Sequence, residues 1–340
     1  MANNQETYRF TDTQGRLLDA KILKVDSDSV LVQLKESGNR LKLDFNKLSE
    51  ADVEFLKMLQ DSPASQNVIK RETPEDPSPA RSDVPANSKL YPRTMEQIRA
   101  GIHEIERRPR PKDVPKAIHE ATQQLNVYRF LCSVPSDVVA DAEYSKEAED
   151  AANACKANGA LSHTIGHSTD HCNLSTMGDM KGTVMRYIED SGDNNREVRG
   201  HRDWCFNPPM AKVGFGSAGK SYSAMWCQDS GGTSINGKWS YPGMGLFPVD
   251  YMHGNAWSLY GVTMPSSPDK IKVEIVKLPK RPDKPYTSDE SIPGRVIKVH
   301  HVSLAFHGIN FEPDEPGKRG IYWVRVKGEG IEEGYLVELY

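Results

Sequence analysis

The fold of the central region is decided by residues 200–226, which read GHRDWCFNPPMAKVGFGSAGKSYSAMW. Within this stretch, Lys212–Gly216 and Ser221–Trp226 are short segments rich in apolar and aromatic residues, and small residues separate them. Short apolar runs bounded by turn residues are typical of strands, and a tight turn makes neighbouring strands antiparallel. A third strand-like segment follows at Ala256–Tyr260. The stretch therefore predicts an antiparallel sheet.

Predicted helices precede this sheet. They cover Pro115–Leu131, Ser145–Lys156 and Met180–Glu189. Proline is favoured in the first turn of a helix, which places the start of the first one at Pro115. The second helix is rich in alanine on one side, so we expect it to pack closely, and Gly159 is a typical stop signal. Helices that flank an antiparallel sheet define an α+β fold.

The N-terminal part, residues 5–60, is patterned as a separate small β domain. Its predicted strands are Tyr8–Phe10, Leu18–Val25, Val30–Leu34 and Arg40–Phe45. Four strands joined by tight turns must bury one face, and closure into a small SH3-like β-barrel achieves this while it removes the sheet edges. Ser49 is predicted to cap a short helix that plugs the barrel.

The remaining segments complete a four-part chain. Residues 61–93 hold six prolines among polar residues, which predicts a disordered linker because few apolar groups are present to offset chain entropy. A helix over Met95–Arg108 follows, with Thr94 as its cap. The predicted domains are thus the barrel at 5–60, the linker at 61–93, an α+β domain at 94–262 and a β-rich extension at 263–340. Strands predicted in the extension are Ile271–Val276, Val296–Val299, Tyr322–Val326 and Tyr335–Tyr340.

Composition argues against two classes of protein. The 340 residues include 43 basic and 47 acidic ones, and the net charge of −4 argues against a dedicated nucleic-acid binder. No apolar run reaches the length of about 18 residues that a transmembrane helix needs, so no membrane span is predicted. The first residues lack the basic and then apolar pattern of an export signal. A cytoplasmic protein and an exported chain with a trimmed signal both remain open on this observation.

All cysteines lie in the central region, at Cys132, Cys155, Cys172, Cys205 and Cys227. Clustering in one domain suits disulfides in an oxidising compartment, although the odd count leaves at least one thiol unpaired within the chain. Buried reduced cysteines that act as small apolar side chains are the other interpretation. No Cys-x-x-Cys pair occurs, which argues against a zinc ribbon.

Several motifs of the central region occur together and in one order. They are Leu125-Asn126-x-Tyr128-Arg129, Leu161-Ser162-His163, Asn173-Leu174-Ser175, Gly200-His201-Arg202-x-Trp204, Asn207-Pro208, Val213-Gly214-x-Gly216 and Ala224-Met225-Trp226. With these motifs, residues 113–262 resemble a bacterial branch of the CAP superfamily (cysteine-rich secretory, antigen-five and pathogenesis-related-one proteins, also called SCP-like). The resemblance implies an α-β-α sandwich. It also implies an extracellular or periplasmic location, with a cytoplasmic one as the alternative.

The same resemblance implies a central cleft with two histidines and two acidic residues. By motif position, His163 and His201 match the histidines, and Asp190, beside Glu189, matches one acidic residue. Cys172 stands where the other acidic residue usually precedes Asn-Leu. Histidine, cysteine and aspartate are all zinc ligands, so this set could hold a divalent metal ion. Hydrogen-bonded structural histidines, and a disulfide at Cys172, are the alternatives.

A second set of motifs lies in the N-terminal domain. It consists of Arg9-Phe10-Thr11-Asp12, Gly15-Arg16, Ala20, Val30-Leu31-Val32 and Lys47-Leu48-Ser49-Glu50-Ala51-Asp52. With these, residues 6–58 resemble the SLA-one homology domain (SHD), an SH3-like module of a fungal endocytic adaptor. The resemblance implies binding of short Asn-Pro-Phe-x-Asp peptides and cytoskeletal or ubiquitin-type adaptor partners. Lys21, Lys24, Arg40 and Lys42 are the candidate peptide-binding residues, and a solvated strand face is the alternative.

These features favour a non-enzymatic modular binding protein. Its barrel would bind proteins or peptides, and its cleft would bind a peptide, a lipid or another small ligand, or a divalent metal such as zinc. A secreted metal-dependent hydrolase that uses His163 and His201 is the alternative, and a purely structural protein is a third interpretation. No catalytic residue is assigned, because Ser162 is only a sequence neighbour of His163 and an activated nucleophile needs an oriented base. No organic cofactor is expected.

Overall fold

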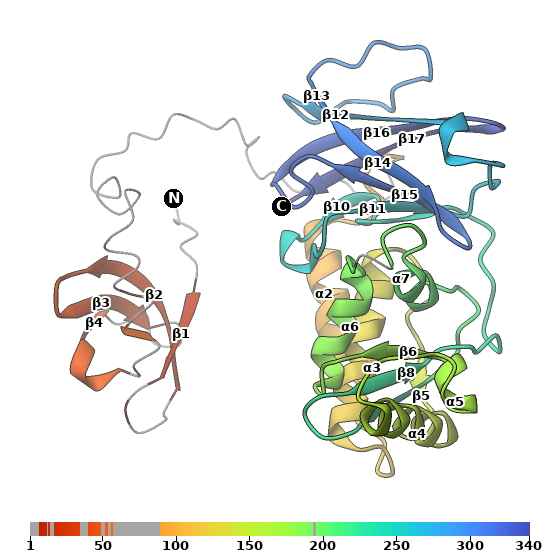
Figure 1. Ribbon diagram of the computed structural model, residues 1–340. Coiled ribbons are helices and arrows are strands. Elements are labelled where there is room, and N and C mark those ends of the chain that lie inside the picture. The colour runs from red at the N-terminus through yellow and green to blue at the C-terminus, as the bar shows by residue number, and fades with distance from the viewer. Residues whose placement is uncertain are drawn as a thin grey trace. The chain divides into compact units, whose positions relative to one another are not determined.

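The computed structural model describes residues 7–11, 13, 17–34, 40–48, 52–53, 56, 89–192 and 195–340. The chain divides into two compact units, Met1–Asp76 and Pro77–Tyr340. Figure 1 labels their helices and strands.

The described part of the first unit is an antiparallel sheet in the order β1-β2-β3-β4. Its strands are β1 (Thr7–Thr11), β2 (Leu17–Val25), β3 (Ser29–Leu34) and β4 (Arg40–Asp44), and the short helix η1 (Phe45–Lys47) follows. The core on one face consists of Phe10, Ala20, Val30, Val32, Phe45, Leu48 and Leu56. The predicted strands are thus present. The sheet is open among the described residues, so closure into an SH3-like barrel stays a prediction, and Ser49 lies outside those residues.

The helices described in the second unit include the four predicted ones and two short ones that are not predicted, and one predicted helix begins at Ala142 instead of Ser145 because the Asp141 side chain caps it. They are α2 (Met95–Glu106), α3 (Lys116–Leu131), α4 (Ala142–Asn158), α5 (His167–Asp170), α6 (Met180–Glu189) and α7 (Gly200–Cys205). The Thr94 hydroxyl accepts from the Gln97 amide at 3.1 Å in a reciprocal capping box. Gly159 ends α4 in the left-handed conformation, with φ 74°. Within the described residues, no helix has the length and apolar character to cross a membrane.

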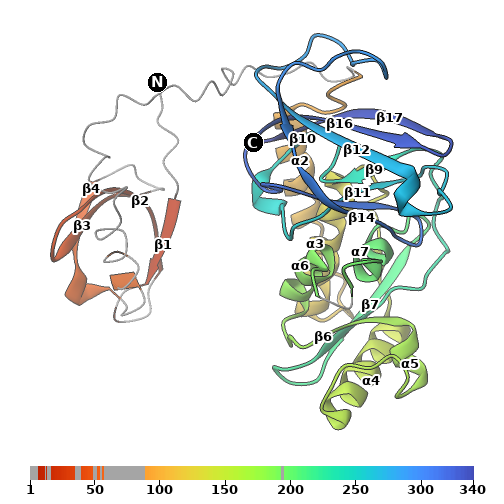
Figure 2. The same cartoon turned by 45° about the horizontal axis from the view of Figure 1, so that its top comes forward.

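A sheet in the order β5-β7-β8-β6 forms the middle layer of this unit. Its strands are β5 (Val139–Ala140), β6 (Cys172–Ser175), β7 (Lys212–Ser217) and β8 (Ser223–Trp226). Alternate residues of a strand point to opposite faces, so Phe215 and Met225 join the main core while Leu174 and Ala224 pack with α4. Figures 1 and 2 show α4 on one side of the sheet and α3 and α6 on the other. The unit is therefore α+β, with helices on both faces of a mixed sheet.

Two glycines let α4 lie directly on β7. A Cβ atom at Gly214 would lie 2.0 Å from the carbonyl carbon of Tyr144, and one at Gly216 would lie 2.1 Å from the amide nitrogen of Glu149. Both contacts are with the helix backbone, which cannot turn aside as a flexible side chain can. The Gly-x-Gly pair therefore serves the close approach of helix and strand.

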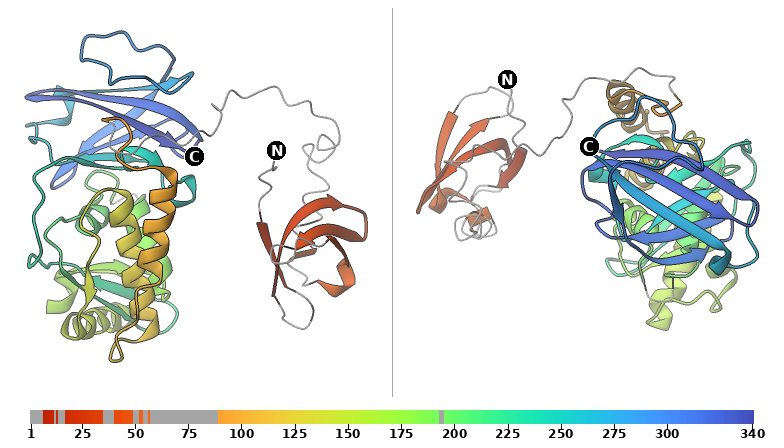
Figure 3. Two further views of the ribbon diagram at one scale, coloured as in Figure 1. Left: turned by 180° about the vertical axis from the view of Figure 1, so that it is seen from behind. Right: turned by 90° about the horizontal axis from the view of Figure 1, so that it is seen from above.

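The C-terminal strands form two further sheets, in the orders β14-β15-β11-β9 and β10-β17-β16-β12-β13. Their strands are β9 (Trp239–Tyr241), β10 (Gly245–Phe247), β11 (Trp257–Tyr260), β12 (Ile271–Leu278), β13 (Arg295–Ile297), β14 (Val299–Leu304), β15 (Gly308–Pro313), β16 (Gly320–Gly328) and β17 (Ile331–Leu339). The rings of Trp257 on β11 and Tyr322 on β16 meet edge to face, with centroids 5.6 Å apart. This contact joins the two sheets in one core, and Figure 3 shows them from behind and from above.

The predicted boundary between residues 262 and 263 does not coincide with a break between sheets. Strands β10 and β11 precede the boundary, yet β10 pairs with β17 and β11 pairs with β15. The predicted extension therefore shares its sheets with the end of the α+β domain. Strand β15 is also absent from the predicted strands.

The expected disulfides are not formed, and this corrects the interpretation of Cys172 as half of a bridge. All five cysteines are free and buried. Burial raises the pKa of the Cys132 and Cys172 thiols well above its usual value and that of Cys227 to about 12. These groups therefore stay protonated near neutral pH and act as small apolar side chains.

We predict that Gly214→Ala lowers the free energy of unfolding by more than about 2 kcal/mol, because the new Cβ would collide with the α4 backbone. Gly237→Ala is the matched control, since nothing lies within 4 Å of its Cβ position, and its effect should stay within about 0.5 kcal/mol. Urea unfolding followed by circular dichroism measures both. Equal stability of the two variants would contradict the close packing of α4 on β7.

Candidate functional site

The predicted cleft residues lie around a cavity of about 250 Å³ in the second unit. Its described lining residues are His163, Asp170, His171, Cys172, Asn173, Asn195, Val198, Gly200, His201, Trp204, Cys227, Gln228 and Phe306. Most come from the α5–β6 region and from α7 with the turn before it, and Phe306 comes from the turn between β14 and β15. The structure thus brings His163, His201 and Cys172 to one cavity although they are far apart in the sequence.

The imidazole of His201, on α7, is fixed by Asp190, whose carboxylate is fully buried. Asp190 Oδ1 lies 2.9 Å from His201 Nδ1, and Asp190 Oδ2 accepts from the amides of His201 (2.9 Å) and Arg202 (3.2 Å). The Asn195 Nδ2 atom also lies 3.3 Å from this nitrogen, but the carboxylate is closer and can only accept, so Nδ1 carries the proton and donates it to Asp190. The Nε2 atom of His201 is then left with its lone pair.

The imidazole of His163 is fixed in the same sense by the backbone. Its Nδ1 lies 2.9 Å from the carbonyl oxygen of Thr169, which can only accept, so Nδ1 again donates and Nε2 keeps its lone pair. The ring centroids of His163 and His201 are 6.5 Å apart, and the ring planes meet at 42°. These two imidazoles therefore share the cavity, which His171 also lines, and in each of the two the nitrogen outside the fixing hydrogen bond is Nε2.

The other predicted residues take different positions. Asp190 lies behind His201 rather than in the lining of the cavity. The Glu189 carboxylate pairs with Arg186 (3.0 Å) and accepts from the Ser191 hydroxyl (2.8 Å), so it faces away from this site. Cys172 does line the cavity, but burial raises the pKa of its thiol and keeps it protonated. Of the predicted set, His163, His201 and Cys172 line the cavity, and the two histidines each keep an unprotonated Nε2.

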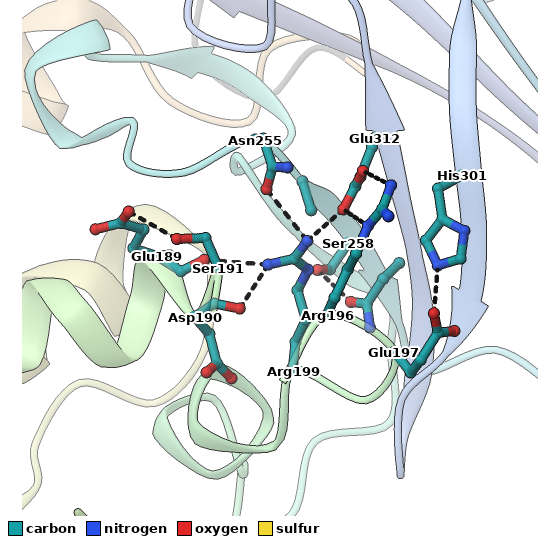
Figure 4. Close-up of polar contacts among 12 residues, drawn as sticks. Glu189, Asp190, Ser191, Arg196, Glu197, Arg199, Asn255, Ser258, His301 and Glu312 are labelled. Carbon is teal, nitrogen blue, oxygen red and sulfur yellow. Dashed lines mark hydrogen bonds and ion pairs between the residues drawn. The ribbon is translucent and has the colours of Figure 1, made fainter. Parts of the chain in front are cut away.

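The segment that carries His201 is held from its other side by buried charges. The Arg199 side chain is 1% exposed, and its Nη1 donates to the Asp190 carbonyl at 2.6 Å. Its Nη2 donates to Glu312 Oε1 on β15, also at 2.6 Å, as Figure 4 shows. Arg196 donates to the same carboxylate at 2.7 Å. Burial favours a higher pKa for Glu312, but the bond to Arg196 and the charges of Arg196 and Arg199 outweigh it and hold that pKa below its usual value.

Arg202 ties α7 to β11. Its Nε donates to the Ile188 carbonyl at 2.6 Å, and its Nη1 donates to the Ala256 carbonyl at 3.0 Å and to the Ser258 hydroxyl at 2.9 Å. The side chain is fully buried, and its Nη2 donates to the Glu189 carbonyl at 3.0 Å, so each of its three nitrogens has an acceptor. In the Gly-His-Arg motif, His201 therefore lines the cavity, and Arg202 fixes α7 to the neighbouring strand.

Two residues of the Leu-Asn-x-Tyr-Arg motif also have structural roles. The Asn126 side chain bonds both the carbonyl (2.8 Å) and the amide (3.1 Å) of Val138. Buried Arg129 donates to the carbonyls of Pro135 (2.6 Å) and Cys205 (2.8 Å), and burial lowers its pKa to about 10. The bond to Cys205 fixes α3 to the end of α7, and the bonds to Pro135 and Val138 fix α3 to the segment before β5.

Sequence reasoning missed Asn195, Trp204 and Phe306 as cavity residues. Trp204 follows His201 by three positions on one helix face, so this spacing could have identified it. Phe306 belongs to the C-terminal strands, and nothing local in the sequence indicates that it approaches His201.

The residues present fit a metal ion only in part. Within the described ranges, no three His, Cys, Asp or Glu side chains come close enough together to hold one. With zinc–nitrogen bonds of about 2.1 Å, two imidazoles on one ion have centroids about 6.5 Å apart only when the N–Zn–N angle is nearly linear. A tetrahedral ion would need the rings about 1 Å closer. The pair could thus supply two ligands to an ion completed by water or a ligand, but it is not a structural zinc site.

Ser162 does not form a nucleophile–base pair with His163 through its described contacts. Its hydroxyl lies 3.1 Å from the Thr164 hydroxyl and accepts from the Thr164 amide at 3.2 Å. The Nδ1 of His163 is already bonded to Thr169. An oriented base is what activates a serine, so these contacts assign no catalytic role to Ser162.

Comparison with known families agrees with this geometry. Residues 123–230 match the family model described as CAP, the cysteine-rich secretory protein family. The matched segment contains His163, His201 and all of the sheet β5-β7-β8-β6, so the chain carries a CAP superfamily domain there. No curated protein and no solved structure matches the chain.

We predict that Glu312→Gln lowers the free energy of unfolding at neutral pH by about 3 kcal/mol, because it leaves the buried Arg199 without its counter-charge. The lowered pKa of Glu312 means that its contribution is present above the usual value of 4.5 and is lost as the pH falls through the lowered value. The difference between wild type and variant should therefore shrink in acid. Urea unfolding at a series of pH values measures it.

Glu315→Gln is the matched control, because Glu315 forms partly exposed ion pairs with Arg295 and Lys318. Its effect should be much smaller, because solvent screens exposed ion pairs. A Glu312→Gln variant as stable as this control would show that the Arg199 pair does not hold the His201 segment.

Proposed function

We propose that the CAP domain is a non-enzymatic binding module whose cavity receives a divalent metal ion, with zinc as the test case, at His163 and His201. One observation carries the proposal: both rings line the same cavity, and each has its Nδ1 proton engaged by a fixed acceptor. Metal-binding histidines characteristically donate their other ring proton to a carboxylate or a carbonyl, which fixes the ring and the tautomer. Asp190 and Thr169 supply one acceptor of each kind.

The proposal concerns reversible binding rather than a resident ion. Two imidazoles at a centroid distance of 6.5 Å leave the remaining coordination positions to water or to a ligand. A bound ion would supply positive charge to the cavity. Thr169 and Asp190 orient the lone pairs of His163 and His201, and burial keeps water away from the Asp190 carboxylate. An extracellular or periplasmic location remains part of the proposal and rests on the secretory family alone, because the described thiols form no disulfide.

We predict that His163→Ala and His201→Ala each weaken zinc binding at least about tenfold, because each removes one of two protein ligands. Asp190→Asn should weaken it about tenfold as well, through the orientation of His201. Isothermal titration calorimetry with zinc chloride on the full chain measures the affinities. His300→Ala is the matched control, since His300 pairs with Asp314 on the surface. Unchanged zinc affinity in His201→Ala would sink the proposal.

The first unit supports a second function, the peptide binding that the SHD resemblance implies. The strand register places Lys21, Gln33 and Arg40 in one row across β2, β3 and β4, and Lys24, Leu31 and Lys42 in the next row. A bulge between Ile22 and Lys24 puts Lys24 on the same face as Lys21. Lys21, Lys24 and Lys42 therefore share one face of the sheet, opposite buried Val30 and Val32. Such a face suits an acidic peptide, and the protein or peptide partner remains a proposal.

We predict that a fluorescent Asn-Pro-Phe-x-Asp peptide binds the full chain and that the pair Lys21→Glu and Lys42→Glu weakens this binding at least about fivefold, through charge repulsion. Lys47→Glu is the control, because Lys47 lies on η1 outside these rows and is 70% exposed. Fluorescence anisotropy at low salt measures the affinities. No saturable binding, or equal affinities in the two variants, would reject the peptide proposal.

A further inference from the structure

The hairpin of β14 and β15 reaches the cavity from the C-terminal part of the chain. The Ala305 amide donates to the Gly308 carbonyl at 2.7 Å, which leaves Phe306 and His307 at the tip. Gly308 lies against β11, where a Cβ atom would approach a ring carbon of Tyr260 to 2.4 Å. The turn and its packing therefore fix the position of the tip.

Phe306 presents an aromatic ring at the cavity. Its side chain is 60% exposed, and it is one of the lining residues. Its Cε2 lies 3.3 Å from the position that a Cβ atom of Gly200 would occupy, and Gly200 directly precedes His201. Trp204, one turn further along α7, also lines the cavity. Two aromatic side chains from distant parts of the chain, Trp204 and Phe306, therefore line the cavity beside His201.

Polar contacts hold this hairpin on the segment that carries His201. His307 Nδ1 lies 2.7 Å from Asp203 Oδ2, and the Asp203 side chain is 2% exposed. Further along β15, Asn310 donates to the Val198 carbonyl at 3.3 Å. Glu312 accepts from Arg199, as Figure 4 shows. These contacts lie on both sides of His201, so the hairpin and the segment 195–205 form one wall.

We propose that Phe306 is a specificity-determining residue of the CAP cavity and that the ligand carries an aromatic ring that packs on it. A hydrogen-bond donor next to that ring would meet the Nε2 atom of His201 or His163. The described lining residues include no lysine or arginine, so the cavity offers no fixed positive charge to an anionic ligand. A cavity of about 250 Å³ suits a single-ring compound. The inference rests on the proposed function, because it names the ligand class of the same cavity.

The test compares benzamide with acetamide, which share the amide donor and differ in phenyl against methyl. Both are titrated into the metal-free full chain and followed by nitrogen–proton correlation spectra. Wild type should prefer benzamide at least about fivefold, because the phenyl ring buries more apolar surface. Phe306→Ala should remove this preference and Phe306→Leu should keep part of it. Val296→Ala, at an apolar residue that is 64% exposed on β13, should leave it unchanged.

Zinc titration of Phe306→Ala separates this inference from the proposed function, because Phe306 is not a zinc ligand and the zinc affinity should equal that of wild type. If zinc does not bind but the benzamide preference depends on Phe306, the proposed function fails and the specificity role stands. The inference is overturned if benzamide does not bind, if both amides bind equally, or if the preference survives in Phe306→Ala.

Discussion

The site depends on one buried carboxylate, that of Asp190. Its oxygens accept hydrogen bonds from Nδ1 of His201 and from two backbone amides at the start of α7. The carboxylate therefore sets both the tautomer of the imidazole and the position of the helix. Asp190 and Arg199 both adopt left-handed backbone conformations, with φ of 44° and 49°, which non-glycine residues adopt at a cost of about 1 kcal/mol or more. The bond from Arg199 to the Asp190 carbonyl joins these two residues. Contacts around the site therefore stabilise a conformation that the local sequence disfavours.

The C-terminal strands also contribute contacts to the site. The family match ends at residue 230, yet the acceptors of Arg199 and Arg202 include Glu312 on β15 and Ser258 on β11. Buried guanidinium groups without acceptors are costly, so the CAP domain of this chain relies on strands outside the matched segment. The same strands carry Phe306 to the cavity. The extension is thus part of the site in addition to being part of the core.

The sequence predicted elements whose signals are local. The capping box at Thr94, the stop at Gly159 and the bounds of α6 are all as expected, because each depends on neighbouring residues. Strand β15 was missed, since Asn310, Glu312 and Pro313 are unusual in a buried strand. Glu312 is tolerated there because Arg196 and Arg199, distant in the sequence, neutralise it.

The candidate site, too, can be predicted from the sequence only in part. Motif order singled out His163 and His201, but it could not distinguish a carboxylate that binds a ligand from one that orients a histidine. Asp190 has the second of these roles, because it orients His201. The odd cysteine count cannot decide between disulfides and free thiols. In the folded chain all five cysteines are free and buried. Phe306 could not be predicted, because its approach to His201 depends on the pairing of β14, β15 and β11.

The tautomers of His163 and His201 decide whether the cavity can work as proposed, and they can be measured directly. Long-range nitrogen–proton correlation spectra of protein labelled at histidine would be recorded well above the ordinary histidine pKa of about 6.5, with assignment from His163→Ala and His201→Ala. Both neutral rings should carry their proton on Nδ1. A proton on Nε2 in either ring would rule out the proposed site, because that ring would then offer a donor instead of a lone pair to the cavity.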